Sequence, residues 1–226
     1  MPTVLAPRAA ALRGFGPVGI LAILIIVLAG KIFPGGIALP LGAVLVLAWA
    51  KASETPWAEI GYAPPKRWAL TVAGGIVLGA TLKLVLKIVV MPLLGAPAIN
   101  STYHYLAGNR AALPAAMWAM LVAGFGEETV FRGFFFERLG KLLGSGAGAR
   151  IGIVLITSLL FGLAHLPDQG LAGAEQAWIT GLVFGSVFAL TGRIWLSMIS
   201  HAAFDLTALT IIYLDLETAA AHLLFR

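Results

Sequence analysis

Long apolar runs decide what this chain can fold into. Seven of them follow one another, most of them close to the roughly 20 residues that an α-helix needs to cross the hydrocarbon core of a membrane. A soluble core does not need several such runs. We therefore predict an all-α fold, a polytopic bundle of seven to eight transmembrane helices. The runs are residues 16–33, 36–50, 68–94, 110–136, 151–166, 176–191 and 194–214.

The composition agrees with a membrane protein. Of the 226 residues, 60% are hydrophobic and only 11% are charged, against about 25% charged residues in soluble domains. We treat residues 1–226 as a single integral-membrane domain. The sequence has no cysteine, which excludes disulfides, thiolate metal sites and a cysteine nucleophile.

Basic residues at the ends of the apolar runs predict the orientation of the chain. The net charge is +5, and its placement is typical of orientation signals, so we expect membrane lipid and not nucleic acid as a partner. A cytoplasmic N-terminus puts nine Lys and Arg residues inside and three outside. This bias favours a multi-pass protein of the cell membrane with its N-terminus in the cytoplasm. We expect polar loops at residues 51–67, 95–109, 137–150 and 168–175.

One apolar run carries three charges in its interior. Glu127, Glu128 and Arg132 stand within residues 117–136, where a charge is expensive unless it is paired or faces a polar cavity. Glu128 and Arg132 are four residues apart, so they share a helix face and are expected to form a supporting ion pair. Glu127 is turned by about 100° from Glu128, which leaves it free to accept a proton.

Two later runs contribute histidines. His165 lies near the end of one run, and His201 and Asp205, again four residues apart, share a face of another. Each has a purely structural reading, because polar side chains also hydrogen-bond helices to one another. The first, second and sixth runs carry no ionisable residue in their interiors. This division favours one shared polar cavity over scattered structural groups.

The third run carries two lysines, Lys83 and Lys87, on one helix face. They either face a polar interior or extend toward the membrane interface, as long basic side chains often do. The sequence leaves both readings open.

These side chains suit hydrolysis by an activated water. Glu127 with His165 is placed to polarise the water, and His201 with Asp205 to stabilise an oxyanion or hold the substrate. Zinc is the alternative, with Glu127, His165 and His201 as ligands. The His-Glu-x-x-His helix motif of many zinc proteases is absent, and we expect no metal cofactor.

Three motifs in this order resemble a known family. Glu127-Glu128-x-x-x-Arg132, Phe161-x-x-x-His165 and His201-x-x-x-Asp205 are similar to those of the CAAX-protease and bacteriocin-processing (CPBP, or Abi) family, which includes the CAAX prenyl endopeptidases. The likeness covers about residues 117–210, the expected catalytic core. It implies a bundle of about eight membrane helices around a conical, water-filled cavity.

The resemblance also implies a role for each residue. Glu127 resembles the catalytic glutamate, His165 the histidine that helps it, Glu128 and Arg132 the supporting pair, and His201 with Asp205 the oxyanion-stabilising pair. The prenyl endopeptidases have Asn at the last position. An ionised Asp cannot donate a hydrogen bond, so Asp205 is either protonated or acts by orienting His201. The family has been described both with and without a metal.

We therefore predict an intramembrane endopeptidase that cleaves a membrane-associated or lipidated, CAAX-like protein or peptide, possibly a prenylated one. One alternative is a non-proteolytic binding or immunity-type membrane protein that keeps the site residues. Another is a proton-coupled carrier, because chains of Asp, Glu and His also relay protons, but no repeat or pair of broken helices supports it.

Overall fold

The computed structural model describes residues 6–32 and 38–225, and these residues form helices and connecting turns without any strand. Residues 33, 36 and 37 of the first two apolar runs, and Arg226, lie outside the described residues. The α-helices are α1 (Pro7–Arg13), α2 (Pro17–Ile32), α3 (Ala38–Ala52), α4 (Trp68–Val85), α5 (Met91–Leu93), α6 (Leu113–Glu128), α7 (Phe135–Leu143), α8 (Ala147–Thr191), α9 (Ile194–Tyr213) and α10 (Glu217–Ala221). Two π-helical segments, η2 (Leu86–Val90) and η4 (Thr129–Phe134), and one 3₁₀ turn, η3 (His104–Leu106), complete them.

The prediction of an all-helical membrane bundle is confirmed. Within the described residues, three helical stretches are long and apolar enough to cross a membrane: Trp68–Leu93, Ala147–Thr191 and Ile194–Tyr213. A fourth is added if α1 and the first part of α2, bent by 55°, count as one span.

This count is below the predicted seven to eight for identifiable reasons. The stretch Ala147–Thr191 contains both the fifth and the sixth predicted runs. The apolar part of α3, Pro40–Ala52, is short. The fourth predicted run carries Glu127, Glu128 and Arg132, so its composition alone does not mark it as a span.

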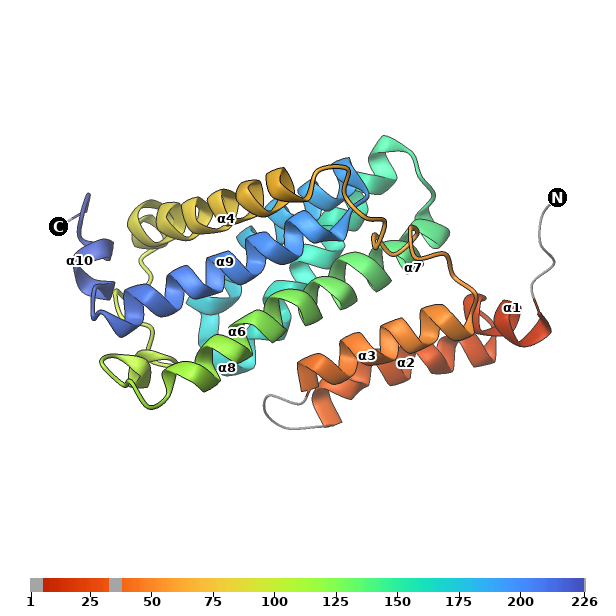
Figure 1. Cartoon of the computed structure of the whole chain (residues 1–226), viewed down its shortest axis with the longest axis horizontal. Helices are drawn as coiled ribbons and strands as arrows, with labels where there is room; N and C mark the ends of the chain where they lie inside the picture. Colours follow the sequence, from red (N-terminus) through yellow and green to blue (C-terminus); the bar gives the residue numbers. More distant parts are fainter. Residues whose placement is uncertain (1–5, 33–37, 226) are drawn as a thin grey trace.

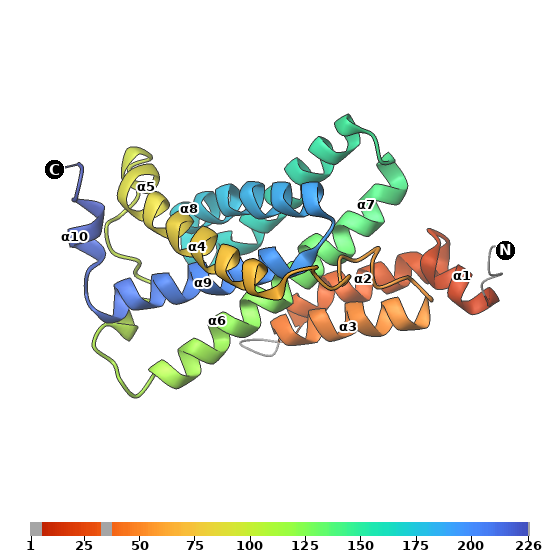
Figure 2. The ribbon, with the colours of Figure 1, turned by 45° about the horizontal axis from the view of Figure 1, so that its top comes forward.

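Three long helices form the centre of the bundle. Figure 1 shows α4 and α9 side by side along the long axis, with α6 on the other side of α9. The hairpin of α2 and α3 lies beside α6, and Figure 2 shows the same neighbours from another side. The helices α1 and α7 lie toward one end of the bundle, and α10 lies at the other.

Glycines let these central helices approach closely. A Cβ atom on Gly79 would lie 2.0 Å from the carbonyl oxygen of Ser200, and one on Gly124 would lie 2.7 Å from the backbone nitrogen of Ala202. Small residues of this kind permit tight helix packing in membranes, where no hydrophobic force drives association. Both contacts fix α9, the helix of His201, against its two neighbours.

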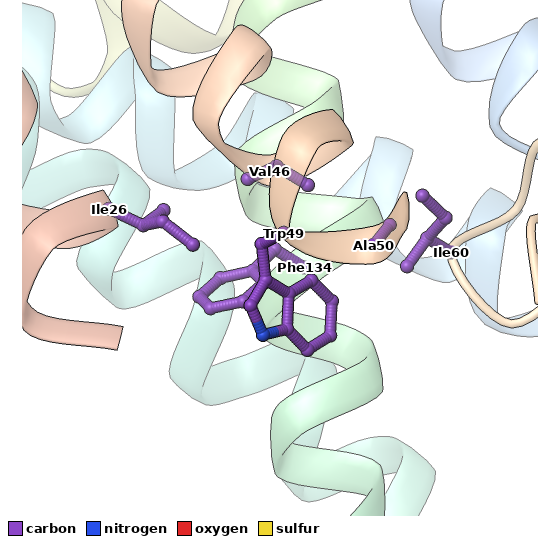
Figure 3. Close-up of a cluster of buried hydrophobic side chains, with 6 residues drawn as sticks. All are labelled: Ile26, Val46, Trp49, Ala50, Ile60 and Phe134. Carbon is purple, nitrogen blue, oxygen red and sulfur yellow. The ribbon is translucent and has the colours of Figure 1, made fainter. Parts of the chain in front are cut away.

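A buried aromatic cluster attaches the N-terminal hairpin to η4. Trp49 of α3 meets Phe134 edge to face with ring centroids 4.9 Å apart. Figure 3 shows these two rings with Ile26, Val46, Ala50 and Ile60 around them. The cluster therefore holds the hairpin against the segment that carries Arg132.

Two predicted loops are wrong. Residues 137–143 continue as α7, and there Glu137 and Arg138, both buried, form an ion pair. The Arg138 guanidinium also lies 4.5 Å from the centroid of the Trp49 ring. The glycines and basic residues of this segment suggested a loop, because composition does not show which charged side chains pair with one another in the fold. Residues 168–175 are helical too, apart from a break at Gly170, whose φ of 65° is left-handed.

The α4–α9 contact gives a direct stability prediction. Gly79→Ala is expected to destabilise the protein by about 1–3 kcal/mol, because the new methyl group has no room against backbone atoms. The matched control is Gly74→Ala, whose Cβ would meet only the Leu196 side chain at 3.9 Å. Denaturant unfolding of both purified variants in detergent measures the difference. Equal stability of the two would contradict the close packing of α4 on α9.

Candidate active site

Glu128 and Arg132 form the buried ion pair predicted from their spacing. The Arg132 Nη1 atom donates to Glu128 Oε1 at 2.7 Å, and both side chains are at most 1% exposed. Arg132 also donates through Nη2 to the carbonyl oxygen of Gly181 at 3.2 Å, and its guanidinium lies 4.8 Å from the centroid of the Phe161 ring. The pair thus connects α6, η4 and α8.

The π-helical segment η4 begins directly after Glu128. Such wide turns are frequent at functional sites. The Thr129 hydroxyl donates to the carbonyl of Phe125 at 2.7 Å and accepts from the Tyr62 hydroxyl at 2.7 Å. Burial raises the pKa of Tyr62, which keeps this phenol protonated as a donor. The link between α3 and α4 therefore braces the turn that positions the charges.

His201 joins the three carboxylates of the site. Its Nδ1 atom lies 2.9 Å from Glu128 Oε1, and because a carboxylate only accepts, Nδ1 carries a proton. Its Nε2 atom lies 3.7 Å from Glu127 Oε2 and 3.6 Å from Asp205 Oδ2. Glu128 therefore fixes the imidazole so that Nε2 faces Glu127 and Asp205.

A cavity of about 310 Å³ adjoins this cluster, and four predicted catalytic side chains line it. Glu127 comes from α6, His165 from α8, and His201 and Asp205 from α9. Glu128 and Arg132 are not among the lining residues. The two adjacent glutamates thus differ as their spacing predicts, since one is tied to arginine and the other faces the cavity.

His165 lines the cavity at some distance from the carboxylate cluster. Its Nδ1 atom donates to the carbonyl oxygen of Phe161 at 2.8 Å, which leaves Nε2 available as an acceptor. In the part of the chain that the structure describes, His165 has no carboxylate within 4.0 Å. The structure therefore brings His165 into the cavity with Glu127 but not into direct contact with it.

Both lysines of α4 and η2 line the same cavity, which answers the question left open by the sequence. The Lys83 ammonium donates to Gln176 Oε1 at 2.9 Å. Lys87 donates to the carbonyl oxygen of Ala98 and lies 3.9 Å from Glu217 Oε1. Their side chains therefore face the polar cavity.

A segment of residues 96–106, which we call the strap, covers one end of the cavity. Glu217 of α10 holds it through the Asn100 backbone N–H at 2.8 Å and His104 Nδ1 at 2.9 Å. Tyr103 of the strap lines the cavity and accepts from Gln169 Nε2 at 3.3 Å. Burial and the neighbouring Asp205, Glu127 and Asp168 carboxylates raise the pKa of Tyr103 to about 12. Sequence reasoning missed the strap, Tyr103 and Glu217 as parts of the site.

Among residues 6–32 and 38–225, no group of three His, Asp or Glu side chains is arranged to hold a metal ion. The alternative ligand set of Glu127, His165 and His201 is split, because His165 lies apart from the other two. We derive no step of the reaction through a metal.

A comparison with protein families decides the class. Residues 109–207 match the family described as type II CAAX prenyl endopeptidase Rce1-like. This part of the chain is an Rce1-like protease domain. The match begins before α6 and ends within α9, so it contains all six predicted site residues. No curated protein and no solved structure matches the chain.

The Rce1-like match confirms three predictions made from the sequence. The family resemblance is confirmed, the protein is a peptide hydrolase, and it belongs to the membrane.

Proposed function

We propose that this Rce1-like protein cleaves a peptide bond near the C-terminus of a prenylated, membrane-attached protein with a water activated by Glu127. One observation carries the proposal: of the two adjacent glutamates, Glu127 lines the cavity, whereas Glu128 is paired with Arg132 and His201. A general base must reach the water that it deprotonates, and Glu127 meets this requirement.

The reaction follows from this arrangement. Glu127 takes one proton from the water, and the water oxygen attacks the carbonyl carbon of the cleaved bond. His165 Nε2 accepts a hydrogen bond from the O–H that remains on this oxygen. The attack converts the carbonyl oxygen into an oxyanion. His201, when protonated on both nitrogens, donates Nε2–H to this oxyanion. The C–N bond then breaks, and the proton held by Glu127 passes to the leaving amine.

Asp205 acts through His201 in this scheme. Its Oδ2 atom lies 3.6 Å from His201 Nε2, so an ionised Asp205 stabilises the positive charge of the imidazolium. It needs no donor hydrogen of its own for this role. Of the two readings left open by the sequence, the distance favours the one in which Asp205 orients His201.

We also propose that the N-terminal end of the bundle faces the cytoplasm and that the membrane is the cell membrane. Three segments with basic residues, α1, α7 and the link from α3 to α4, lie toward the same end in Figure 1. An excess of Lys and Arg on one side is the usual signal for the cytoplasmic side. Glu127, near the end of α6, then lies toward that side.

The function is tested with a prenylated peptide ending in Cys-aliphatic-aliphatic-X, incorporated in liposomes with the purified protein. Mass spectrometry of the products identifies the cleaved bond. We expect cleavage of the prenylated peptide and much slower cleavage of the same peptide without the lipid. Binding without any cleavage would favour the non-proteolytic alternative.

A chelator distinguishes the two kinds of water activation. Because we propose that Glu127 activates the water without a metal, 1,10-phenanthroline or EDTA is expected to leave the rate of cleavage unchanged. A catalytic zinc generates the nucleophile itself, so its removal would abolish the reaction. Loss of activity that added zinc restores would therefore contradict the metal-free scheme.

A further inference from the structure

Lys83 is a buried cation that the proposed reaction does not use. It is 7% exposed and lines the cavity. It donates to the neutral amide of Gln176 and lies over the face of the Phe204 ring, whose centroid is 5.0 Å from Nζ. Within the described residues no carboxylate lies within 4.0 Å of it. The Asp205 and Glu217 carboxylates attract it from farther away. An ammonium has three donor hydrogens, and among the described residues Gln176 accepts one of them.

Lys87 adds a second cation one helical turn further along the same wall. Its contacts with the Ala98 carbonyl and with Glu217 hold it beside the strap. The Glu217 carboxylate also accepts hydrogen bonds from the Asn100 N–H and from His104, so it neutralises Lys87 only in part. The covered end of the cavity is therefore positively charged, whereas the other part holds Glu127 and Asp205.

The helix geometry gives the distance between the two parts. Figure 1 shows α4 and α9 running in the same direction, and Gly79 lies against the backbone of Ser200 and Phe204, level with His201. Lys83 and Lys87 follow Gly79 by one and two turns. At about 1.5 Å per residue their Cα atoms lie about 6 and 12 Å further along the axis than the level of His201.

We propose that Lys83, assisted by Lys87, binds the free α-carboxylate at the C-terminus of the substrate. This inference rests on the proposed function. An extended peptide rises about 3.3 Å per residue, so a carboxylate held between the two lysines is about two to four residues away from a bond cleaved beside Glu127. A Cys-aliphatic-aliphatic-X end has three residues after its cysteine, which falls in this range. The lysines then determine how far from the C-terminus of the substrate the cleaved bond lies.

The test compares two prenylated Cys-aliphatic-aliphatic-X peptides that differ in the last group, a free carboxylate in one and a carboxamide in the other. Wild-type protein is expected to cleave the acid about 10- to 100-fold better in kcat/KM, as a charge-assisted hydrogen bond implies. Lys83→Met keeps the length of the side chain over Phe204 and is expected to lower cleavage of the acid to the level of the amide. Cleavage of the amide reports that the variant is folded and active. Lys51→Met, on the exposed end of α3, is the control and is expected to keep the preference.

Peptides with one to six residues after the prenylated cysteine test the distance. Cleavage after the cysteine is expected only when two to four residues follow. Equal cleavage of acid and amide by the wild type, an equal loss on both peptides in Lys83→Met, or cleavage at any distance from the end would overturn the carboxylate site and leave the protease function standing. Failure of the folded wild type to cleave either peptide would instead overturn the proposed function.

Discussion

Glu127→Gln is expected to lower kcat for peptide hydrolysis by about 10²- to 10⁴-fold, the range that general acid–base catalysis contributes. Glutamine has nearly the same shape, so it can occupy the same place beside His201, but its amide does not accept a proton from water. Substrate binding is expected to persist, because the cavity and the two lysines are unchanged. The measurement is cleavage of the prenylated peptide in liposomes, with KM determined separately from kcat.

The control variants separate chemistry from folding. Glu59→Gln changes an exposed glutamate that pairs with Arg13, outside the residues that line the cavity, and should keep full activity. Glu128→Gln should lose activity and stability together, because Glu128 holds both Arg132 and His201. A folded Glu127→Gln protein with wild-type kcat would exclude Glu127 as the base.

Local spacing predicted the parts of the site that lie on single helices. The i, i+4 relation placed Arg132 against Glu128 and Asp205 against His201, and both contacts are present. This relation depends only on the pitch of a helix. It held for Glu128 and Arg132 even though the backbone widens to a π-helix at Thr129, since the two side chains still share a face.

Contacts between distant segments were not predictable from one sequence. The strap is held by Glu217, more than 100 residues further along the chain. Tyr103 and Glu217 occur outside the apolar runs, where polar residues are ordinary, so no local cost marked them. Lys83 and Lys87 did carry such a signal, because cations within an apolar run need a reason. Only the packing of α4 on α9 shows that their side chains face the cavity.

The composition of a segment also predicts its structure less well than its contacts in the fold do. Residues 137–143 read as a basic loop, yet Arg138 is buried between Glu137 and the Trp49 ring and donates to the Arg13 carbonyl at 2.8 Å. A charged side chain can be buried when it is paired and hydrogen-bonded. The partners of Arg138 come from α1, α3 and α7, so only the assembled fold reveals them.

Arg132→Met is expected to destabilise the protein by about 3–5 kcal/mol, the usual effect of removing one partner from a buried ion pair. The variant leaves the Glu128 carboxylate, which is fully buried, without its arginine. It also removes the hydrogen bond from Nη2 to the Gly181 carbonyl, which ties η4 to α8. Unfolding of the purified protein in detergent by denaturant titration measures the loss.

The double variant Glu128→Gln/Arg132→Met tests whether the unpaired charge causes the loss. It removes both charges, and the glutamine oxygen can still accept the hydrogen bond from His201 Nδ1. It should therefore be more stable than Arg132→Met alone, although it has one more substitution, because neighbouring charges are not additive in their effects. Glu59→Gln breaks an exposed pair and is expected to change stability by no more than about 1 kcal/mol. The double variant could instead lose as much stability as the two single variants together. In that case Arg132 would stabilise the protein mainly by packing its guanidinium against Phe161, and neutralisation of Glu128 would contribute little.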